Sequence, residues 1–294
     1  MKNKSQEPLV SIIMNCHNGE KYLSESLKSI QSQTYKNYEV IFFDNCSSDN
    51  SSKIFLQFND TRFKYFLLKD KIKLYNARNL ALDKCNGEII TFLDTDDLWK
   101  VDKLELQVAE MTKNSEIGLC YSYYEIYDQS KNRSKLIKPK LSKNLKNYLL
   151  KKYDIALVSI AIKKEYLQKH NLRFNSNFDI IGDFDLVINL SHYYQFSLIK
   201  KKLCIYRDHK DSETNNNYEK LVEEMQSWYN NNLDNQIFSN CSNINHIKNK
   251  IYYYQGLNFL KKNEFEEFKL NLNNLGHNMY KLKLYTKFIL KKII

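Results

Sequence analysis

Residues 87–97 read Gly-Glu-Ile-Ile-Thr-Phe-Leu-Asp-Thr-Asp-Asp, a short apolar run that ends abruptly in acidic side chains. An apolar run of this length is typical of a strand buried on both faces of a parallel sheet. Upstream, similar runs alternate with helical patterns: the runs cover residues 9–15, 38–44 and 63–67, and the helical patterns cover residues 20–33 and 75–85. This alternation predicts an α/β fold in which helices flank a mixed, mostly parallel sheet.

Polar side chains follow nearly every predicted strand. They lie at residues 15–18, 44–49 and 94–97. In open α/β sheets, ligands bind outside the carboxyl ends of the strands. We therefore expect these three segments to meet in one ligand-binding crevice.

The pattern changes after a predicted helix at residues 101–113. A Tyr-rich strand, a basic loop, a second strand, a helix and a last strand are expected at residues 117–127, 131–143, 155–162, 184–194 and 196–206. Beyond residue 211 the chain is polar, rich in Asn and helical in pattern, with a helical hairpin expected at residues 251–275. These changes predict segment boundaries near residues 113 and 215.

The composition limits the classes of partner. A formal charge of +11 and a pI near 9.1 attract polyanions, but no module with interleaved basic and aromatic residues is found, so no nucleic-acid partner is expected. The six cysteines form no CxxC pair, which argues against a zinc site. The first apolar run is too short for a signal peptide and no stretch reaches the ~20 apolar residues of a membrane span, so a cytoplasmic location is expected.

The last sixteen residues, 279–294, carry five lysines and no acidic residue. Apolar side chains lie near one face of the predicted helix; they are Leu282, Tyr285, Phe288, Ile289 and Ile293. Such a basic amphipathic segment is typical of a helix that binds a membrane surface. A helix that packs on its own domain with solvated lysines has the same pattern, so both interpretations stay open.

The acidic residues after the strand at residues 88–93 suggest a metal site. Carboxylates at a strand end suit a hard cation such as Mg²⁺ or Mn²⁺, with water and phosphate completing its coordination. Acidic residues in this position also cap helices, and a predicted helix follows closely. The residues alone leave both interpretations open.

Several motifs extend this pattern over the first hundred residues. They are Pro-Leu-Val-Ser-Ile-Ile at 8–13, the helical segment at 22–35, Ser-Ser-Asp-Asn-Ser at 47–51, Asn-Ala-Arg-Asn-Leu-Ala at 76–81 and the acidic strand end at 87–97. In this order and spacing they resemble the inverting family 2 glycosyltransferases, which have the GT-A fold. The resemblance is strong over residues 8–112, moderate over residues 155–212 and absent beyond them.

The resemblance implies transfer of a sugar from a nucleotide-diphosphate sugar, with UDP favoured, to an acceptor hydroxyl, using Mn²⁺ or Mg²⁺ and inverting the anomeric carbon. It assigns donor binding to residues 1–112 and acceptor binding with the catalytic base to residues 113–214, and leaves residues 215–294 as a helical appendage. The implied setting is bacterial surface polysaccharide or lipid-linked glycan assembly at the inner face of the cell membrane. The alternative is a non-catalytic nucleotide-sugar or glycan-binding protein with the same fold.

The resemblance also assigns residues to the donor. The acid ending the second strand, Asp44, would bind the nucleobase, and Arg78 would lie against the nucleotide. The sequence departs from the family at residues 15–18, where His17 stands in place of the usual tyrosine, and at Asn45, where a second Asp is common. The full expected nucleotide-binding set is Asn15, His17, Asn18, Asp44, Asn45, Arg78, Asp94 and Thr95.

Metal and catalytic roles follow from the same resemblance. Asp96 is the first expected metal ligand, and Asp94 is expected to meet the ribose or a metal-bound water. His209, in Tyr-Arg-Asp-His at 206–209, is expected to contact the metal or a phosphate, although a histidine after a strand can equally be structural. Asp183 is the expected base, which removes the proton of the acceptor hydroxyl, and Asp185 is the second choice. Both acidic residues also suit the first turn of a helix.

Overall fold

The computed structural model describes residues 7–210, 217–235, 237–238, 241–276 and 278–293. The chain divides into two compact units. The first consists of Met1–Lys143 and Asp154–His209, and the second of Asn144–Tyr153 and Lys210–Ile294. The assignment of donor and acceptor halves to residues 1–112 and 113–214 stays a prediction.

The first unit is built on one sheet. Its described residues form nine strands, eight of them in the order β3-β2-β1-β4-β8-β6-β9-β5, with β7 paired to β6. The strands are β1 (Val10–Cys16), β2 (Tyr38–Asp44), β3 (Phe63–Leu67), β4 (Ile89–Phe92), β5 (Leu98–Trp99), β6 (Ile117–Asp128), β7 (Arg133–Ile137), β8 (Ala161–Lys163) and β9 (Gln195–Asp208). Strands β5, β7 and β8 pair antiparallel and the other pairings are parallel, so the predicted mixed, mostly parallel α/β sheet is confirmed.

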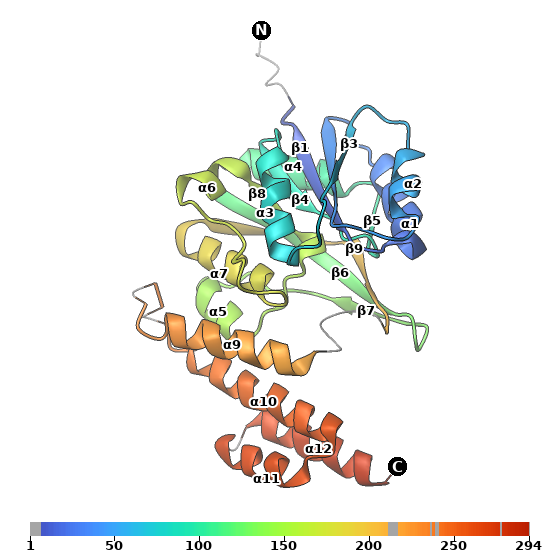
Figure 1. Cartoon of the computed structure of the whole chain (residues 1–294). Coiled ribbons are helices and arrows are strands. Elements are labelled where there is room, and N and C mark those ends of the chain that lie inside the picture. Colours follow the sequence, from blue (N-terminus) through green and yellow to red (C-terminus); the bar gives the residue numbers. More distant parts are fainter. Residues whose placement is uncertain (1–6, 211–216, 236, 239–240, 277, 294) are drawn as a thin grey trace. The chain divides into compact units, whose positions relative to one another are not determined.

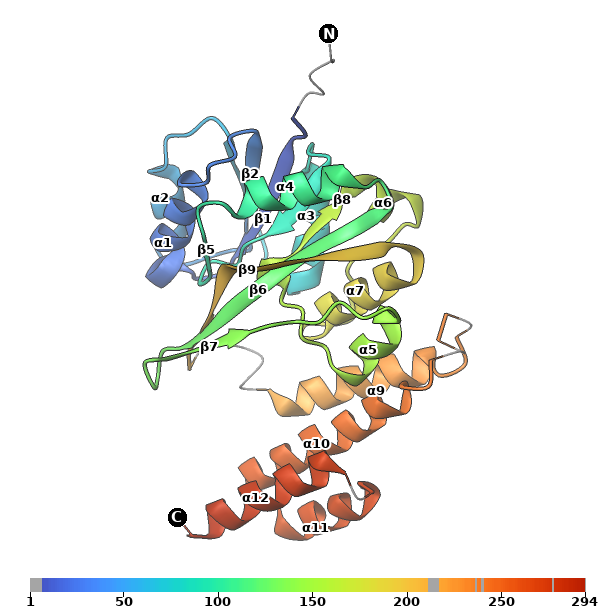
Figure 2. The same cartoon turned by 180° about the vertical axis from the view of Figure 1, so that it is seen from behind.

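Helices cover both faces of this sheet. Helix α3 lies in front of it in Figure 1, and α4 lies in front of it in the reverse view of Figure 2. The helices of the first unit are α1 (Glu20–Gln31), α2 (Ser51–Leu56), α3 (Leu74–Lys84), α4 (Lys103–Lys113), α6 (Lys164–Lys169) and α7 (Gly182–Tyr193). All seven residues of β1 are buried, as expected for a strand covered on both faces.

Alternation along β1 divides its side chains between the two layers. Val10, Ile12 and Met14 belong to one apolar cluster with Leu23 and Leu27 of α1. Successive strand residues point to opposite faces, so Ile13 is on the other face, where α3 packs on β1 and β2. The sheet therefore has an apolar core on each side.

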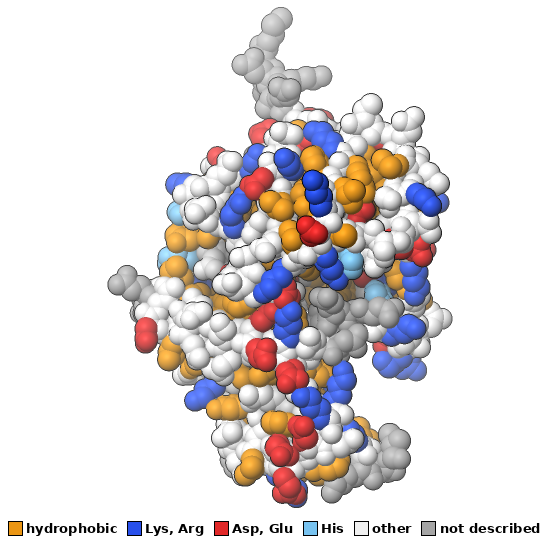
Figure 3. Space-filling model, in the orientation of Figure 1, with side chains coloured by type: hydrophobic (Ala, Val, Ile, Leu, Met, Phe, Trp, Pro, Cys, Tyr) orange, Lys and Arg blue, Asp and Glu red, His pale blue; other side chains and the backbone are white. Residues whose placement is uncertain are grey.

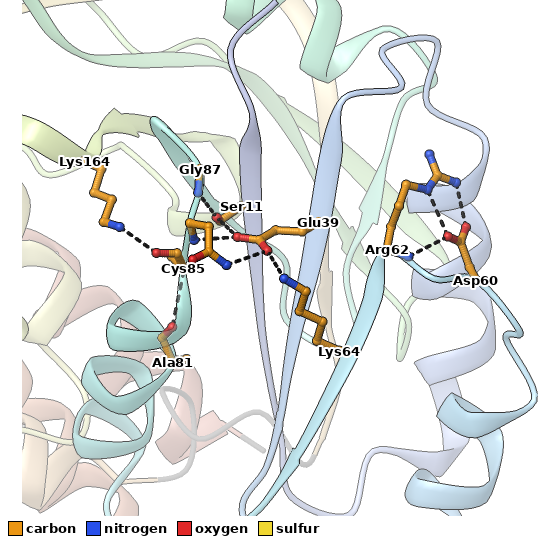
Figure 4. A network of polar contacts seen from close by, with 10 residues as sticks. Ser11, Glu39, Asp60, Arg62, Lys64, Ala81, Cys85, Gly87 and Lys164 are labelled. Carbon is orange, nitrogen blue, oxygen red and sulfur yellow. Dashed lines mark hydrogen bonds and ion pairs between the residues drawn. The ribbon is translucent and has the colours of Figure 1, made fainter.

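A buried carboxylate joins the strands at the edge opposite those ends (Figure 4). Glu39 of β2 accepts hydrogen bonds from Ser11 of β1 at 2.6 Å and from the backbone N–H of Asn86 at 2.6 Å, and it pairs with Lys64 of β3 at 2.6 Å. Burial alone raises the pKa of Glu39, but these hydrogen bonds outweigh it and lower the pKa to about 2. Gly87 completes the network by donating its N–H to Ser11.

Two predicted segments differ from the structure. The segment at residues 155–162, expected to be a strand, contains a 3₁₀ turn, η1 (Leu157–Ser159), and only its last two residues belong to a strand, the short β8. The basic loop expected at residues 131–143 contains strand β7. Four of the five β7 side chains are exposed, so this strand is held by backbone pairing to β6 and leaves little hydrophobic pattern in the sequence.

The second unit is helical, as predicted for the end of the chain. Its described helices are α5 (Leu145–Lys151), α9 (Tyr218–Asn232), α10 (Asn245–Lys262), α11 (Phe265–Asn274) and α12 (Met279–Ile293). Helices α10 and α11 form the expected hairpin, which turns at Asn263 in the left-handed conformation at φ 64°. None of the described helices is long and apolar enough to cross a membrane.

The predicted face of α12 is partly wrong. Leu284 and Phe288 pack on α10 and α11, whereas Leu282, Tyr285 and Ile289 are exposed. The side of α12 that packs is the side that carries Leu284. This side chain lies against Gly256, the one residue of α10 without a side chain, where there is room for it. Ile293 was also expected on this face, but the described side chains of α12 end before it.

Candidate active site

Three strands place the candidate site at one edge of the sheet. In the parallel register, Cys16 at the end of β1 lies opposite Asp44 at the end of β2, and Ile13 lies opposite Phe92 at the end of β4. The segments that follow these strands carry most of the predicted residues. The sheet therefore brings residues 15–18, 44–49 and 94–97 to the same edge, as expected for an open α/β sheet.

Asp44 is held in a fixed position. One carboxylate oxygen accepts the Tyr65 hydroxyl at 2.7 Å and the other accepts the Ser47 backbone N–H at 2.8 Å. The side chain is almost fully buried. A carboxylate has lone pairs for about four hydrogen bonds, so Asp44 keeps acceptor capacity for a further donor group.

Asn15 is the clearest sign of a ligand at this edge. Its side chain is buried, yet within the described residues neither its Nδ2 nor its Oδ1 has a hydrogen-bond partner. A buried amide without partners costs about 1–3 kcal/mol, which a bound ligand with matching groups would recover. One donor beside one acceptor is the arrangement that pairs with the imide edge of a pyrimidine base.

The other predicted residues of this loop have mainly structural contacts. Asn45 exchanges two hydrogen bonds with the backbone of Ile72, at 2.7 and 2.9 Å. Asn18 has φ 56° and accepts the Ser48 backbone N–H at 2.8 Å. His17 is exposed, and its Nδ1 lies 3.0 Å from the carbonyl oxygen of Asn45. Asn18 and Asn45 therefore shape the loops, while His17 presents its ring to solvent at the same edge.

Arg78 and Asp94 form an ion pair across the site. Arg78, on α3, is almost fully buried, and its guanidinium donates to Asp94 at 2.7 Å. The ring of Tyr75 lies 5.3 Å from the guanidinium carbon. Asp94 is more exposed than its partner, so the pair presents a carboxylate to solvent while its cation is buried.

Asp96 and Asp97 complete a cluster of three acidic residues. Asp96 lies 2.9 Å from His209 Nε2, and Asp97 accepts the Arg207 backbone N–H at 2.9 Å. Burial and then the neighbouring Asp94 raise the pKa of Asp96, and burial followed by Asp96 and Asp94 raises that of Asp97 well above its usual range. A cation at this cluster would relieve the repulsion between these carboxylates.

Thr95 lies at the point where two loops of the site touch. A Cβ on Gly19 would fall 2.9 Å from Thr95 Oγ1, closer than real contacts allow, and 3.1 Å from Cys16 Sγ, which is also tight. Ser26 of α1 donates to the Thr95 carbonyl at 2.7 Å. The glycine therefore lets the loop after β1 approach the acidic turn.

Asp183 opens helix α7. Its backbone N–H donates to the Tyr75 hydroxyl at 3.2 Å, and one carboxylate oxygen accepts the N–H of Phe184 at 2.8 Å. Tyr75 is fully buried; burial and then the charge of Asp183 raise its pKa well above the usual value. The charges of Asp183 and Asp94 both raise the pKa of Tyr75 and that of Arg78. Asp183 and Asp94 therefore act on the same two side chains.

Asp185 is positioned differently. Its Oδ1 accepts the amide of Asn189, one turn along the same helix, at 3.1 Å. This contact directs the carboxylate along α7.

The residues present fit a divalent cation only in part. Within the described residues, no group of three or more His, Cys, Asp or Glu side chains is arranged as a complete metal site. Mg²⁺ is usually bound by one or two carboxylates together with water and substrate phosphates. The two carboxylates of Asp94 and Asp96 match such an incomplete set, which water and a diphosphate would complete, and His209 contacts Asp96 beside it.

Sequence reasoning missed three residues that organise the site. Arg207 donates to the Asp96 carbonyl at 2.8 Å and pairs with Glu25 at 2.8 Å, so it fixes the acidic turn. Tyr65 and Tyr75 hold Asp44 and Asp183. Arg207 lies in the Tyr-Arg-Asp-His segment at residues 206–209. Nothing in the sequence links either tyrosine to its acidic partner.

The fold and this site agree with the comparison with known families. The model of glycosyl transferase family 2 matches residues 11–180, more than half of the chain. The protein therefore belongs to this family.

Curated relatives support the same class. The chain is 37% identical over 166 residues to the Escherichia coli UDP-Glc:alpha-D-GlcNAc-diphosphoundecaprenol beta-1,3-glucosyltransferase WfgD. This match covers 56% of this chain and 64% of the relative. It is 36% identical over 111 residues to the putative teichuronic acid biosynthesis glycosyltransferase TuaG of Bacillus subtilis, 37% of this chain and 44% of the relative. The matched part thus spans less than two thirds of these relatives.

Solved structures confirm the GT-A fold. The S. aureus TarS 1–349 complex with UDP-GlcNAc superposes with a TM-score of 0.68 at 18% identity, over 90% of this chain and 79% of that one. A Pyrobaculum calidifontis mannosyltransferase in complex with GDP-Man and Mn²⁺ superposes with a TM-score of 0.63 at 17% identity, over 97% of this chain and 81% of that one.

Proposed function

We propose that the protein is a metal-dependent inverting glycosyltransferase that uses a UDP-sugar donor. The buried amide of Asn15, which has no hydrogen-bond partner among the described residues, carries the proposal, because it lies at the end of β1 and matches the imide edge of uracil. An amide would also pair with guanine, so Asn15 alone does not choose between UDP and GDP. We favour UDP because the name of the E. coli relative gives UDP-Glc as its donor.

The acidic cluster supplies the second argument. When the glycosyl–phosphate bond breaks, negative charge develops on the departing diphosphate, and a divalent cation would neutralise it. Asp96 and Asp94 would hold Mn²⁺ or Mg²⁺, with His209 orienting Asp96 through their 2.9 Å contact. Asp94, Thr95, Asn15, His17, Asn18, Asp44, Asn45 and Arg78 would form or shape the donor site.

Asp183 is the proposed base. In a single displacement, it would take the proton of the acceptor hydroxyl while that oxygen attacks the anomeric carbon from the face opposite the diphosphate. Its carboxylate lies at the N-terminus of α7, within the electrostatic reach of Tyr75 and Arg78. Asp185, which binds Asn189, is the second candidate.

The acceptor is proposed from the relatives. The names of the E. coli and B. subtilis proteins refer to a diphosphoundecaprenol-linked sugar and to teichuronic acid. We infer that the chain acts in surface polysaccharide or lipid-linked glycan assembly at the inner face of the cell membrane.

The test combines a donor panel with two variants. Purified protein is incubated with UDP-, GDP- and dTDP-sugars, Mn²⁺ and a diphospholipid-linked GlcNAc acceptor, and product is measured with and without EDTA. We expect one UDP-sugar to be used and EDTA to stop transfer. Asp183→Asn should slow transfer by about 10²–10⁴-fold while leaving nucleotide binding intact.

Asp185→Asn distinguishes the two candidate bases. If this variant loses transfer and Asp183→Asn does not, the base is Asp185. Nucleotide binding without transfer from any donor, with acceptor present, would instead favour a non-catalytic binding protein.

A further inference from the structure

We propose that helix α12 carries a binding surface for anionic lipid bilayers, formed by its exposed apolar face and the lysines beside it. The proposal concerns the second unit alone and goes beyond the donor chemistry. Figure 2 shows α12 beside α10 and α11 at the end of the chain.

One side of α12 is already used for packing. Leu284 is fully buried, and Phe288 stacks on Phe268 of α11 with ring centroids 5.0 Å apart. Lys291 is directed to the same side, where its Nζ donates to the Leu260 carbonyl. The helix is therefore anchored, and its opposite side is not needed to hold the unit together.

The opposite side is apolar as well. At 100° per residue, the side chains that point away from Leu284 are Met279, Leu282, Tyr285, Ile289 and Leu290, and each is 49–65% exposed. Contiguous exposed apolar side chains on a helix are costly in water and mark an interaction surface.

A polar residue within this face is already satisfied. Thr286 lies between Leu282 and Leu290 around the helix, and its hydroxyl donates to the Leu282 carbonyl at 2.9 Å. The face can therefore leave water without exposing an unpaired hydroxyl to an apolar phase.

Lysines border the face on both sides. By the same geometry, Lys281 lies at one margin and Lys283 and Lys287 lie at the other. Within the described residues none of the three has an acidic partner, and the sequence of α12 has no acidic residue. Long lysine stems lie along apolar surface while their ammonium groups remain in water, as in helices at membrane interfaces.

These features select one occupant. A protein partner would need a matching apolar groove, whereas an apolar strip bordered by cations alone matches the acyl and headgroup layers of an anionic bilayer. Each lysine near such a surface strengthens binding about fivefold.

The experiment uses the full chain and vesicle sedimentation. Wild-type protein should bind phosphatidylglycerol-containing vesicles more tightly than pure phosphatidylcholine vesicles, and added salt should weaken this binding. Leu282→Glu with Ile289→Glu should weaken binding at least about tenfold, and changing Lys281, Lys283 and Lys287 to Gln should weaken it about a hundredfold.

The matched control places two glutamates at equally exposed leucines elsewhere. Leu56 is 63% exposed and Leu270 is 68% exposed, so Leu56→Glu with Leu270→Glu adds the same charge without touching α12. This control should keep binding within about twofold to threefold, because two added acidic residues only reduce the net charge. Circular dichroism must show equal helicity and melting temperature for every variant compared.

Three outcomes would overturn the proposal. The first is that anionic vesicles do not retain the wild-type protein. The second is that the Leu282→Glu, Ile289→Glu variant binds as tightly as the wild type. The third is a dimer in light scattering that the same variant dissociates and that does not bind vesicles, which would assign the face to self-association. Sugar transfer is not the readout, so failure of the donor proposal would leave this test unaffected.

Discussion

Gly182 shows how one residue sets the geometry of the site. A Cβ at this position would fall 2.6 Å from the Tyr75 ring, so the ring occupies the space a side chain would need. Tyr75 in turn donates its hydroxyl to the Ile180 carbonyl and accepts the N–H of Asp183. The absence of a side chain at Gly182 therefore lets the Tyr75 ring pack against the backbone that leads into Asp183.

We predict that Gly182→Ala destabilises the protein and displaces Asp183. Overpacking against a buried ring costs about 1–3 kcal/mol, more than the ~1 kcal/mol that Ala gains over Gly in a helix. Urea unfolding measures the stability, and the transfer assay measures the displacement. Gly276→Ala is the matched control, because nothing lies within 4 Å of its Cβ position. Equal stability of the two variants would contradict the packing argument.

Residue types alone pointed to the site but not to its pairings. The acidic turn at residues 94–97 follows a strand, and this predicted its place at the sheet edge. The Arg78–Asp94 and Asp96–His209 contacts join residues 16 and 113 positions apart, which no local pattern records. The sequence likewise left the role of His209 open. That role depends on the contact with Asp96, which the sequence does not show.

At the scale of elements, Glu39 connects three strands at the edge away from the site. Its pKa is about 2 in the folded protein and 4.5 in an unfolded chain, so its stabilising effect is present above pH 4.5 and is lost as the pH falls toward 2. Lys64, its ionic partner, is 43% exposed, so solvent screening reduces the effect to about 1–2 kcal/mol.

Glu39→Gln should therefore lower the free energy of unfolding by about 1–2 kcal/mol at pH 7, with a difference that shrinks below pH 4.5. Urea unfolding of both proteins between pH 7 and pH 3 measures it. Glu110→Gln, which breaks an exposed pair with Lys113, should cost no more than about 0.5 kcal/mol. A Glu39→Gln difference that stays constant over this pH range would refute the ionic account.

Strands and helices whose buried apolar side chains recur at regular spacing were predictable from the sequence. The expected strands at residues 38–44 and 63–67 coincide with β2 and β3, and the helical pattern expected at residues 20–33 matches α1, where Leu23 and Ile30 are buried. Strand β7 and turn η1 were missed because backbone pairing and local hydrogen bonds hold them. The packed side of α12 was missed because both sides of that helix are apolar, and only the position of Gly256 selects between them.

At the scale of the whole molecule, the charge of +11 is consistent with an anionic substrate. On the face drawn in Figure 3, basic side chains are interspersed with acidic and apolar ones and form no continuous basic strip. That distribution suits local binding of phosphate groups better than a long polyanion. Under the two proposals made above, the first unit would bind the donor and the second would contact a membrane.

The central claim is that the strand edge binds a nucleotide through a divalent cation. Calorimetric titration of UDP into the full chain, with Mn²⁺ and then with EDTA, tests it most directly. We expect binding with Mn²⁺ to be at least about tenfold tighter than without it, and Asp96→Asn to abolish this difference. Absence of UDP binding, or binding of equal strength with and without Mn²⁺ in both proteins, would contradict the account.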